Sequence, residues 1–154
     1  MSESFSAAGP DDLPQLVELL GILFTQEHEL APDADKQARG LRLILGDPAI
    51  GSIYVARDGA AGSNSVLGMV SILRTVSTAE GGAAGHLEDF VVRPECRGRG
   101  LGARLLAYAI EQARAGGLHR LILLTDGDNS SAQRLYERAG FGRSGMLPMR
   151  LKLR

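Results

Sequence analysis

The sequence predicts a mixed α/β fold in a single domain. A chain of 154 residues is the right size for one domain with a sizeable core. Strand-like and helix-like hydrophobic periods alternate along it, and a glycine-rich turn at residues 97–104 joins an apolar extended segment to a helix-like one. We therefore expect one domain over residues 1–154, with a mixed sheet and helices on both of its faces.

The first half of the chain should supply an edge strand, two helices and a hairpin. Pro10 and the acids after it are typical of a helix start. The face of this first helix that should be buried carries Leu13, Leu16, Val17, Leu20 and Leu23. The expected elements are a strand over Ser4–Ala8, helices from Asp12 to about Glu29 and over Asp35–Leu45, and paired strands over Ser52–Arg57 and Val66–Val76.

The second half should continue with a flexible connection, then strands that alternate with helices. Gly116-Gly117 and Gly140 are helix terminators, and Asn129 or Ser130 is a helix cap. The expected elements are a connection over Thr78–Gly85, a strand over His86–Arg93, a helix over Gly100–Ala115, a strand over Arg120–Thr125, a helix ending at Gly140, and strands within Phe141–Lys152. The predicted order is β-αα-βββ-α-β-α-β(β).

Composition argues against several classes of protein. The net charge of −1 lacks the basic surface of a nucleic-acid binder. No apolar run approaches the ~20 residues that span a bilayer, and the N-terminus has no secretory pattern, so we expect a cytoplasmic protein. Cys96 is the only cysteine, and neither it nor His86 has the neighbours of a metal site. We expect no metal.

The segment Gly85–Leu106 is the most informative part of the chain. It runs from an apolar strand through Pro94 into a turn rich in arginine and glycine that opens a helix. Glycines let backbone N–H groups approach an anion, and a helix N-terminus adds unpaired donors and a positive dipole end. Arg97, Arg99 and Arg104 add formal charge. A pyrophosphate is the expected ligand.

Two kinds of pyrophosphate compound fit this turn. Gly98, Gly100 and Ala103 also satisfy the dinucleotide fingerprint G-x-G-x-x-G/A. A dinucleotide-binding fold, however, places this turn after its first strand and needs further βα units downstream. Nicotinamide-dependent redox chemistry is therefore the less favoured interpretation.

A second motif decides between them. Residues 129–141 read N-x-x-A-x-x-L-Y-x-x-x-G-F. Together with Arg97-x-x-Gly100-x-Gly102, this motif resembles the GNAT superfamily of N-acetyltransferases, which bind acetyl-coenzyme A. The resemblance is sharp from about Leu87 to Phe141. It implies the acetyltransferase fold, with a central, mostly antiparallel, splayed sheet.

The resemblance implies where acetyl-coenzyme A binds. Its diphosphate should lie on the backbone of the turn, and its pantetheine arm should lie along the strand that ends at Pro94. The cofactor-binding residues implied are Phe90, Val91, Val92, Arg97, Gly98, Arg99, Gly100, Leu101, Gly102, Asn129, Ala132 and Tyr136. A backbone N–H near Phe90 should hold the thioester oxygen.

The resemblance also suggests the catalytic groups. Tyr136 is the expected general acid for the departing sulfur, although a buried aromatic in the core would have the same pattern. Glu88 and Asp89 are the candidate bases; opposite strand faces allow only one of them to face the cleft, and we favour Glu88. Both acids would equally serve as ion-pair partners of a neighbouring arginine.

The acceptor should be a primary amine of a small molecule. The resemblance places residues 24–35, which carry four acids, on the acceptor side, although a solvated polar loop would have the same composition. A protein or peptide N-terminus is the second acceptor class, and a non-catalytic acetyl-coenzyme A sensor is the alternative to an enzyme. Residues Met146 to Leu153 are expected to form an edge strand that could pair across a homodimer.

Overall fold

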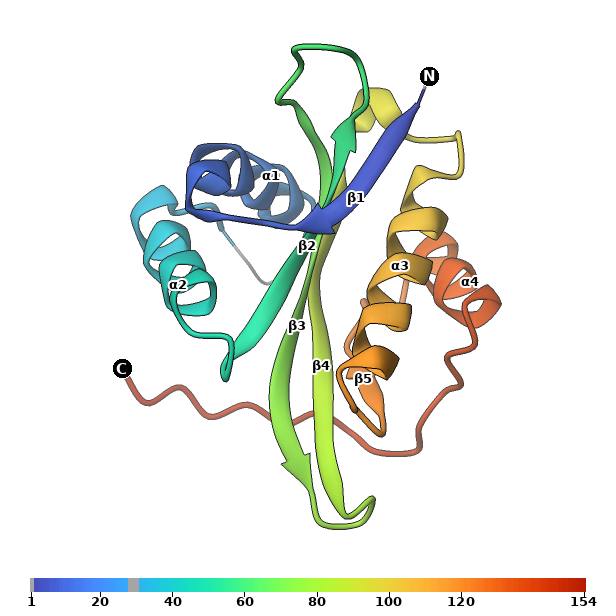
Figure 1. Cartoon of the computed structure of the whole chain (residues 1–154). Helices are drawn as coiled ribbons and strands as arrows, with labels where there is room; N and C mark the ends of the chain where they lie inside the picture. Colours follow the sequence, from blue (N-terminus) through green and yellow to red (C-terminus); the bar gives the residue numbers. More distant parts are fainter. Residues whose placement is uncertain (1, 28–30) are drawn as a thin grey trace.

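The computed structural model describes residues 2–27 and 31–154. The elements are β1 (Glu3–Ala7), the 3-10 helix η1 (Pro10–Asp12), α1 (Leu13–Gln26), α2 (Ala34–Gly46), β2 (Gly51–Asp58), β3 (Val66–Ser77), β4 (Gly82–Val92), the 3-10 helix η2 (Pro94–Cys96), α3 (Leu101–Ala115), β5 (Leu121–Leu123) and α4 (Ser130–Arg138). Figure 1 shows a twisted sheet with α1 and α2 on one face and α3 and α4 on the other. The predicted mixed fold with helices on both faces is confirmed.

The sheet is antiparallel except at one edge. Its strand order is β1-β2-β3-β4-β5, and only β4 and β5 run parallel. The β4–β5 ladder is short, joining residues 85–87 to residues 121–123. Past Leu87 the two strands are no longer paired, so the sheet splays there as expected.

Two hydrophobic cores hold the helices on the sheet. Leu16 and Leu20 of α1 belong to the core beneath α1 and α2, whereas Leu105 and Leu106 of α3 belong to the core on the other face. All four are almost completely buried. Since full burial of such a side chain stabilises the fold by about 1.5–3 kcal/mol, these leucines fix the two helices against the sheet.

The connection expected over Thr78–Gly85 is largely strand, and that prediction was wrong. The turn is confined to residues 78–81, and β4 begins at Gly82. The glycines that suggested a loop serve close packing instead. A Cβ on Gly85 would lie 2.9 Å from the side chains of Ile72 and Leu121, and one on Gly82 would lie 2.5 Å from the ring of His119. Tertiary contacts override local propensity here.

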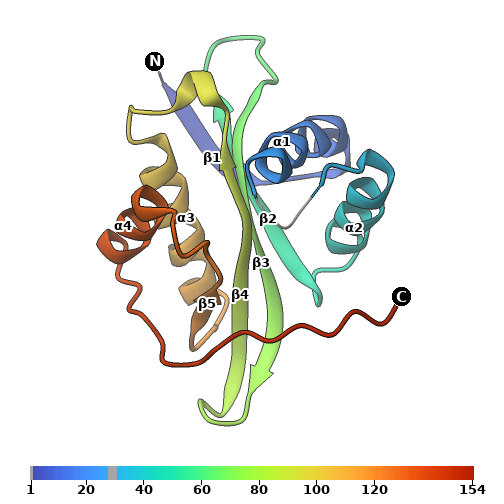
Figure 2. The same cartoon turned by 180° about the vertical axis from the view of Figure 1, so that it is seen from behind.

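The strands expected within Phe141–Lys152 are also absent, since residues 141–154 contain no helix or strand. Figures 1 and 2 show why. After α4 the chain crosses β4 and β3 on the side of the turn that joins these two strands, and finishes on the α2 side of the sheet. None of the described strands pairs with it there. The first helix ends at Gln26, and Glu29, its predicted end, lies outside the described residues.

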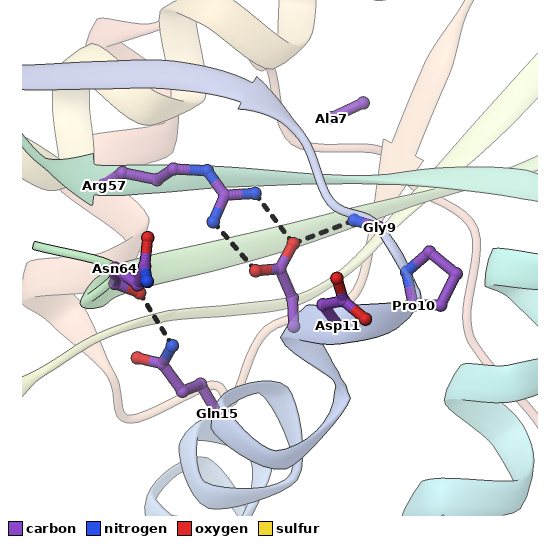
Figure 3. Close-up of a pocket in the computed structure, with 8 residues that line it drawn as sticks. Ala7, Gly9, Pro10, Asp11, Gln15, Arg57 and Asn64 are labelled. Carbon is purple, nitrogen blue, oxygen red and sulfur yellow. Dashed lines mark hydrogen bonds and ion pairs between the residues drawn. The ribbon is translucent and has the colours of Figure 1, made fainter. Parts of the chain in front are cut away.

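A partly buried ion pair joins the start of α1 to the sheet (Figure 3). Arg57 of β2 donates from Nη1 to Asp12 Oδ1 at 2.8 Å and from Nη2 to Oδ2 at 2.7 Å, and the N–H of Gly9 donates to Oδ2 at 2.8 Å. The hydrogen bond from Arg57 holds the pKa of Asp12 below its usual value. This pair lines a cleft of about 480 Å³ beside Pro10 and Asn64.

Asp12→Ala is expected to lower the free energy of unfolding by about 3 kcal/mol, because it leaves the guanidinium of Arg57 half-buried and unpaired. Because the pKa of Asp12 is depressed by folding, its stabilisation is full above the unfolded-state pKa near 3.9 and is lost as the pH falls through the folded value. Urea melts at pH 7 and pH 3 test both statements. Asp11→Ala removes the exposed neighbouring acid and is the control.

Candidate functional site

The site begins with a bulge in β4. Met69 pairs with Val91 and Ser71 pairs with Glu88, so Asp89 and Phe90 together stand opposite the single residue Val70. Asp89 has φ 53°, a left-handed value that no other non-glycine residue in the described part of the chain adopts. A bulge leaves the extra residue out of the ladder and redirects the side chains around it.

The other edge of β4 is open at the same place. Pairing with β5 stops at Leu87, so within residues 2–27 and 31–154 no strand pairs with residues 88–92 on that side. Backbone N–H and C=O groups left in this way accept an extended ligand as they would an added strand. Val91 and Val92 point into the two cores and are at most 9% exposed. Their contribution to such a ligand would be their backbone.

The glycine-rich turn lies directly after this open edge. Gly98 (φ 80°) and Gly100 (φ 77°) are both left-handed, and α3 begins at Leu101. The first four N–H groups of a helix have no intrahelical partner. The turn therefore presents a row of backbone donors at a positive helix end, which is the arrangement that binds phosphate.

The arginine side chains of this segment stabilise the turn by donating hydrogen bonds to backbone carbonyls. Arg97 Nε donates to the carbonyl of Val92 at 3.1 Å, and Arg99 Nη2 donates to the carbonyl of Glu95 at 2.8 Å. Arg104 donates to the carbonyl of Arg99 at 3.0 Å and forms an ion pair with Glu3 of β1. Arg97 and Arg99 thus keep their charge at the turn, whereas the charge of Arg104 is paired.

Phe90 links the turn to α4. A Cβ placed on Gly102 would lie 3.3 Å from Phe90 Cζ and 3.9 Å from Leu135 Cδ2, so the first turn of α3 approaches β4 closely. The Phe90 ring lies 6.0 Å from the ring of Tyr136, which in turn lies 6.0 Å from Phe141. The two sequence motifs, at residues 97–102 and 129–141, therefore meet around Phe90.

Local hydrogen bonds position α4 and its tyrosine. The Asn129 side chain accepts from the N–H of Ala132 at 3.2 Å, which caps the helix as expected. Gln133 Nε2 donates to the carbonyls of Asp126 and Gly127 at 2.8 and 3.0 Å. Burial, with the nearby charge of Glu27, raises the pKa of Tyr136 to about 12. Its hydroxyl is a hydrogen-bond donor at every pH in the physiological range.

Acids gather beside this tyrosine. Burial, reinforced by Glu88 and Glu27, raises the pKa of Asp89 to about 6. Burial also raises the pKa of Glu27, at the end of α1, and the charge of Asp126 adds to the effect. Glu27 is therefore close enough to influence Asp89 and Tyr136, and itself responds to Asp126. Glu88 is exposed.

The structure thus brings together most residues that the sequence singled out. Asp89 is largely buried, whereas Glu88, which the sequence analysis favoured as base, is exposed to solvent. Glu27 belongs to the segment 24–35 that was expected on the acceptor side, but it was not selected as a catalytic residue. Asp126 was not selected for this site, and its only sequence signal was acidity in a loop. Three residues of the expected acceptor loop, His28, Glu29 and Leu30, lie outside the described residues.

The rest of the described chain offers no second site of comparable chemistry. No group of three or more His, Cys, Asp or Glu side chains among them is arranged to hold a metal ion. The cleft in Figure 3 has a charged pair whose partners satisfy each other. In residues 2–27 and 31–154, no helix has the length and apolar character to cross a bilayer.

Comparison with known proteins points to one family. The model of the Acetyltransferase (GNAT) family matches residues 13–141. The L-methionine sulfoximine/L-methionine sulfone acetyltransferase of Pseudomonas paraeruginosa is 43% identical over 68 residues, 44% of this chain and 40% of that protein. The aminoalkylphosphonate N-acetyltransferase of Salmonella typhimurium is 31% identical over 105 residues, 68% of this chain and 65% of that protein. The chain thus spans less than two thirds of either relative.

Solved structures show the same fold. A crystal structure of a predicted acetyltransferase from Clostridium acetobutylicum with acetyl-CoA matches with a TM-score of 0.75, covering 99% of this chain and 96% of that chain at 17% identity. At that identity the likeness concerns the fold alone.

Proposed function

Because the chain belongs to the acetyltransferase (GNAT) family, we propose that it is an enzyme that transfers the acetyl group of acetyl-coenzyme A to a primary amine of a small molecule. One observation carries this proposal: the unpaired edge of β4 leads from the anion-binding turn before α3 to Tyr136 and Asp89. A thioester held along that edge would lie between a donor for its sulfur and an acid for the amine.

The residues present fit acetyl-coenzyme A. The backbone from Arg97 to Gly102 offers donors for the diphosphate, and Arg97 and Arg99 add charge. The open edge of residues 88–92 suits the two amides of the pantetheine arm, which pair as a strand would. Ala132 is small and half-buried one turn before Tyr136, which leaves room for the thiol end.

The reaction forms a C–N bond and breaks the C–S bond. The carbonyl oxygen gains charge during attack, and the backbone N–H of Phe90, within the bulge, is the proposed donor that stabilises it. The amine must lose a proton, and its ammonium form, with a pKa near 10.4, costs about 4–5 kcal/mol to deprotonate at pH 7. Asp89, ionised at pH 7 yet more basic than an ordinary aspartate, is the proposed acceptor of that proton, directly or through water.

The acids define the proposed acceptor class. Glu27 and Asp89 lie beside the expected position of the thioester, with Asp126 near Glu27. Such an environment favours a cationic amine over one that carries a phosphate close to its nitrogen, because like charges repel most strongly where burial lowers the dielectric constant. A small amine without an anionic group next to the nitrogen is therefore the preferred substrate.

Release of free thiol from acetyl-coenzyme A is the direct test. The panel should contain polyamines, amino acids, amino sugars, an aminoalkylphosphonate and short peptides. We expect acceptor-dependent release with the cationic small amines. Release with peptides alone would favour the protein N-terminus as acceptor. Calorimetric binding of acetyl-coenzyme A without release for any acceptor would overturn the enzyme in favour of a sensor.

The glycine turn gives a separate test of cofactor binding. Gly100→Val places a β-branched side chain at φ 77° and 3.1 Å from Arg104 Nη1, so the turn must change shape. We expect the affinity for acetyl-coenzyme A to fall about 10–100-fold in calorimetry, the equivalent of 1–3 kcal/mol of strain and lost hydrogen bonds. Gly62→Val is the matched control, because Gly62 has the same φ in a loop away from the site. Equal loss of affinity in both variants would remove the role of the turn.

A further inference from the structure

Polar residues on one side of η1 and α1 tie the helix to the sheet and to the segment after β4. In chain order the contacts are Asp12 with Arg57, Gln15 with the N–H of Val66, Glu18 with Arg93, and Gln26 with Arg97. Arg93 and Arg97 both come from the segment between β4 and α3, which also contains the glycine-rich turn. Two arginines therefore connect α1 to the proposed cofactor site.

The contact at the end of α1 uses several donors of one guanidinium. Arg97 Nε donates to the carbonyl of Val92 at 3.1 Å. With its side-chain amide turned so that the oxygen faces the guanidinium, Gln26 accepts from Arg97 Nη2 at 2.9 Å and from Nη1 at 3.2 Å. A guanidinium carries two N–H groups on each Nη in a rigid, planar fork. One N–H on each Nη therefore remains for an anion at the turn.

Gln26 stands directly before an acid of the acceptor side. It is the last residue of α1, and Glu27 follows it as the C-cap in an extended conformation, with φ −90° and ψ 141°. The charge of Glu27 acts on Asp89 and on Tyr136. The residue that Arg97 holds is thus joined by one peptide bond to a group of the proposed reaction site.

The two arginine contacts differ in burial. The side chain of Arg93 is 14% exposed, and it donates to the carbonyl of Val66 at 2.7 Å besides pairing with Glu18. Arg97 and Gln26 are both exposed, so their contact contributes little by itself. A phosphate group at the turn would strengthen it, because the ligand covers the guanidinium and accepts charge-assisted hydrogen bonds from it.

We propose that Gln26 is a positioning residue that acts through Arg97: coenzyme A bound at the turn fixes the guanidinium, and the guanidinium fixes the end of α1 and the place of Glu27. This role rests on the proposed binding of acetyl-coenzyme A at the turn. A phosphate oxygen accepts from the two remaining N–H groups, so Val92, Gln26 and the ligand hold the guanidinium together. The end of α1 is ordered in the cofactor complex, and amine binding no longer bears that entropic cost.

Hydrogen exchange with coenzyme A as the probe tests the link without an acceptor. In the wild type, saturating coenzyme A should slow exchange of the amides of residues 24–27 by about threefold or more. Gln26→Met keeps the length and helix propensity of the side chain but removes its acceptor, so this slowing should be lost. The calorimetric Kd for coenzyme A should stay within about threefold, because the backbone of the turn is unchanged. Gln26→Glu restores an acceptor for Arg97 and should restore the slowing.

Steady-state kinetics give a second readout. Gln26→Met should raise KM about fivefold for an amine accepted in the thiol-release assay, while kcat and the KM for acetyl-coenzyme A stay within about twofold. Gln15→Met is the matched control, since it is the same substitution on the same side of α1 at the other end of the helix. It should lower Tm but leave the KM for the amine and the exchange of residues 24–27 unchanged.

The outcomes separate this link from the proposed function. Binding of coenzyme A to the wild type without slower exchange at residues 24–27 would overturn the link and leave the proposed function standing. Slowing that persists in Gln26→Met would also overturn it, as would an equal rise in KM in Gln15→Met, because the effect would then come from any loosening of α1. Absence of calorimetric binding of coenzyme A to the wild type would remove both the link and the proposed function.

Discussion

Asp89→Asn is expected to reduce kcat/KM for the amine about 100-fold at pH 7, while it makes the protein more stable. The loss follows from removal of the proposed proton acceptor, for which 10²–10⁴-fold is the usual range. The low end applies because the small neutral fraction of the amine, formed by loss of a proton to bulk water, can still enter the site without a base. Asparagine suits the position sterically, since it tolerates the left-handed conformation that residue 89 adopts at φ 53°.

The charge of Asp89 destabilises the folded protein, whereas the charge of an acid in an ordinary ion pair stabilises it. Burial raises the pKa of Asp89 to about 6, above its unfolded value near 3.9, so the folded state binds the extra proton between these two pH values. The stability of the wild type therefore falls as the pH rises through this window, and the charge is unfavourable at pH 7. Asp89→Asn removes that cost, which is on the order of 2 kcal/mol before screening by solvent. Thermal melts at pH 4 and pH 7 measure it.

The pH profile separates the two candidate bases. In the wild type, kcat/KM for the amine should rise through an apparent pKa near 6 and lose this limb in Asp89→Asn. Glu88→Gln should keep the limb, because Glu88 is exposed. If Glu88→Gln abolishes the limb and Asp89→Asn does not, Asp89 is not the base and Glu88 takes its place.

The geometry of the turn and of the α4 cap, the parts proposed to hold the cofactor, was predictable because it is built from local sequence. Gly98 and Gly100 indicate left-handed turn positions, and Asn129 indicates a helix cap. Each acts within a few residues, so neither requires knowledge of the remainder of the fold. That the two motifs serve one cofactor was implied by the family resemblance and by neither motif alone, and their meeting around Phe90 is a finding of the structure.

The acceptor side was not predictable in the same way. Which acid is enclosed depends on a one-residue bulge in β4, and a one-residue shift moves a side chain to the other face of a strand. Alternation along β4 could not place that bulge. Glu27 reaches Asp89 from the end of α1, some 60 residues earlier in the chain. Contacts of that range are set by packing of α1 on the sheet, which no local pattern records.

Tyr136→Phe is expected to lower kcat by about 100–1000-fold while the affinity for acetyl-coenzyme A stays within twofold. The hydroxyl is lost, but the ring and its contacts with Phe90 and Phe141 remain. Loss of one donor to a developing charge costs about this much in other enzymes. Tyr108→Phe is the control, since Tyr108 stacks on Phe5 and contacts Tyr54 edge to face, and its ring contacts none of Phe90, Tyr136 and Phe141. Wild-type turnover in Tyr136→Phe would leave the residue a packing role only.

The shifted pKa defines what the hydroxyl can do. A phenol with a pKa of about 12 would protonate a thiolate of pKa near 8.5 against a gradient of roughly 3–4 pKa units, on the order of 4–5 kcal/mol. Complete transfer of the proton in the chemical step is therefore unfavourable, and the hydroxyl acts best by donating a hydrogen bond to the sulfur as the C–S bond breaks. The activity should then show no basic limb from Tyr136 below about pH 10. A limb near pH 8 that disappears in Tyr136→Phe would show instead that the tyrosine is a true acid with a much lower pKa in the working complex.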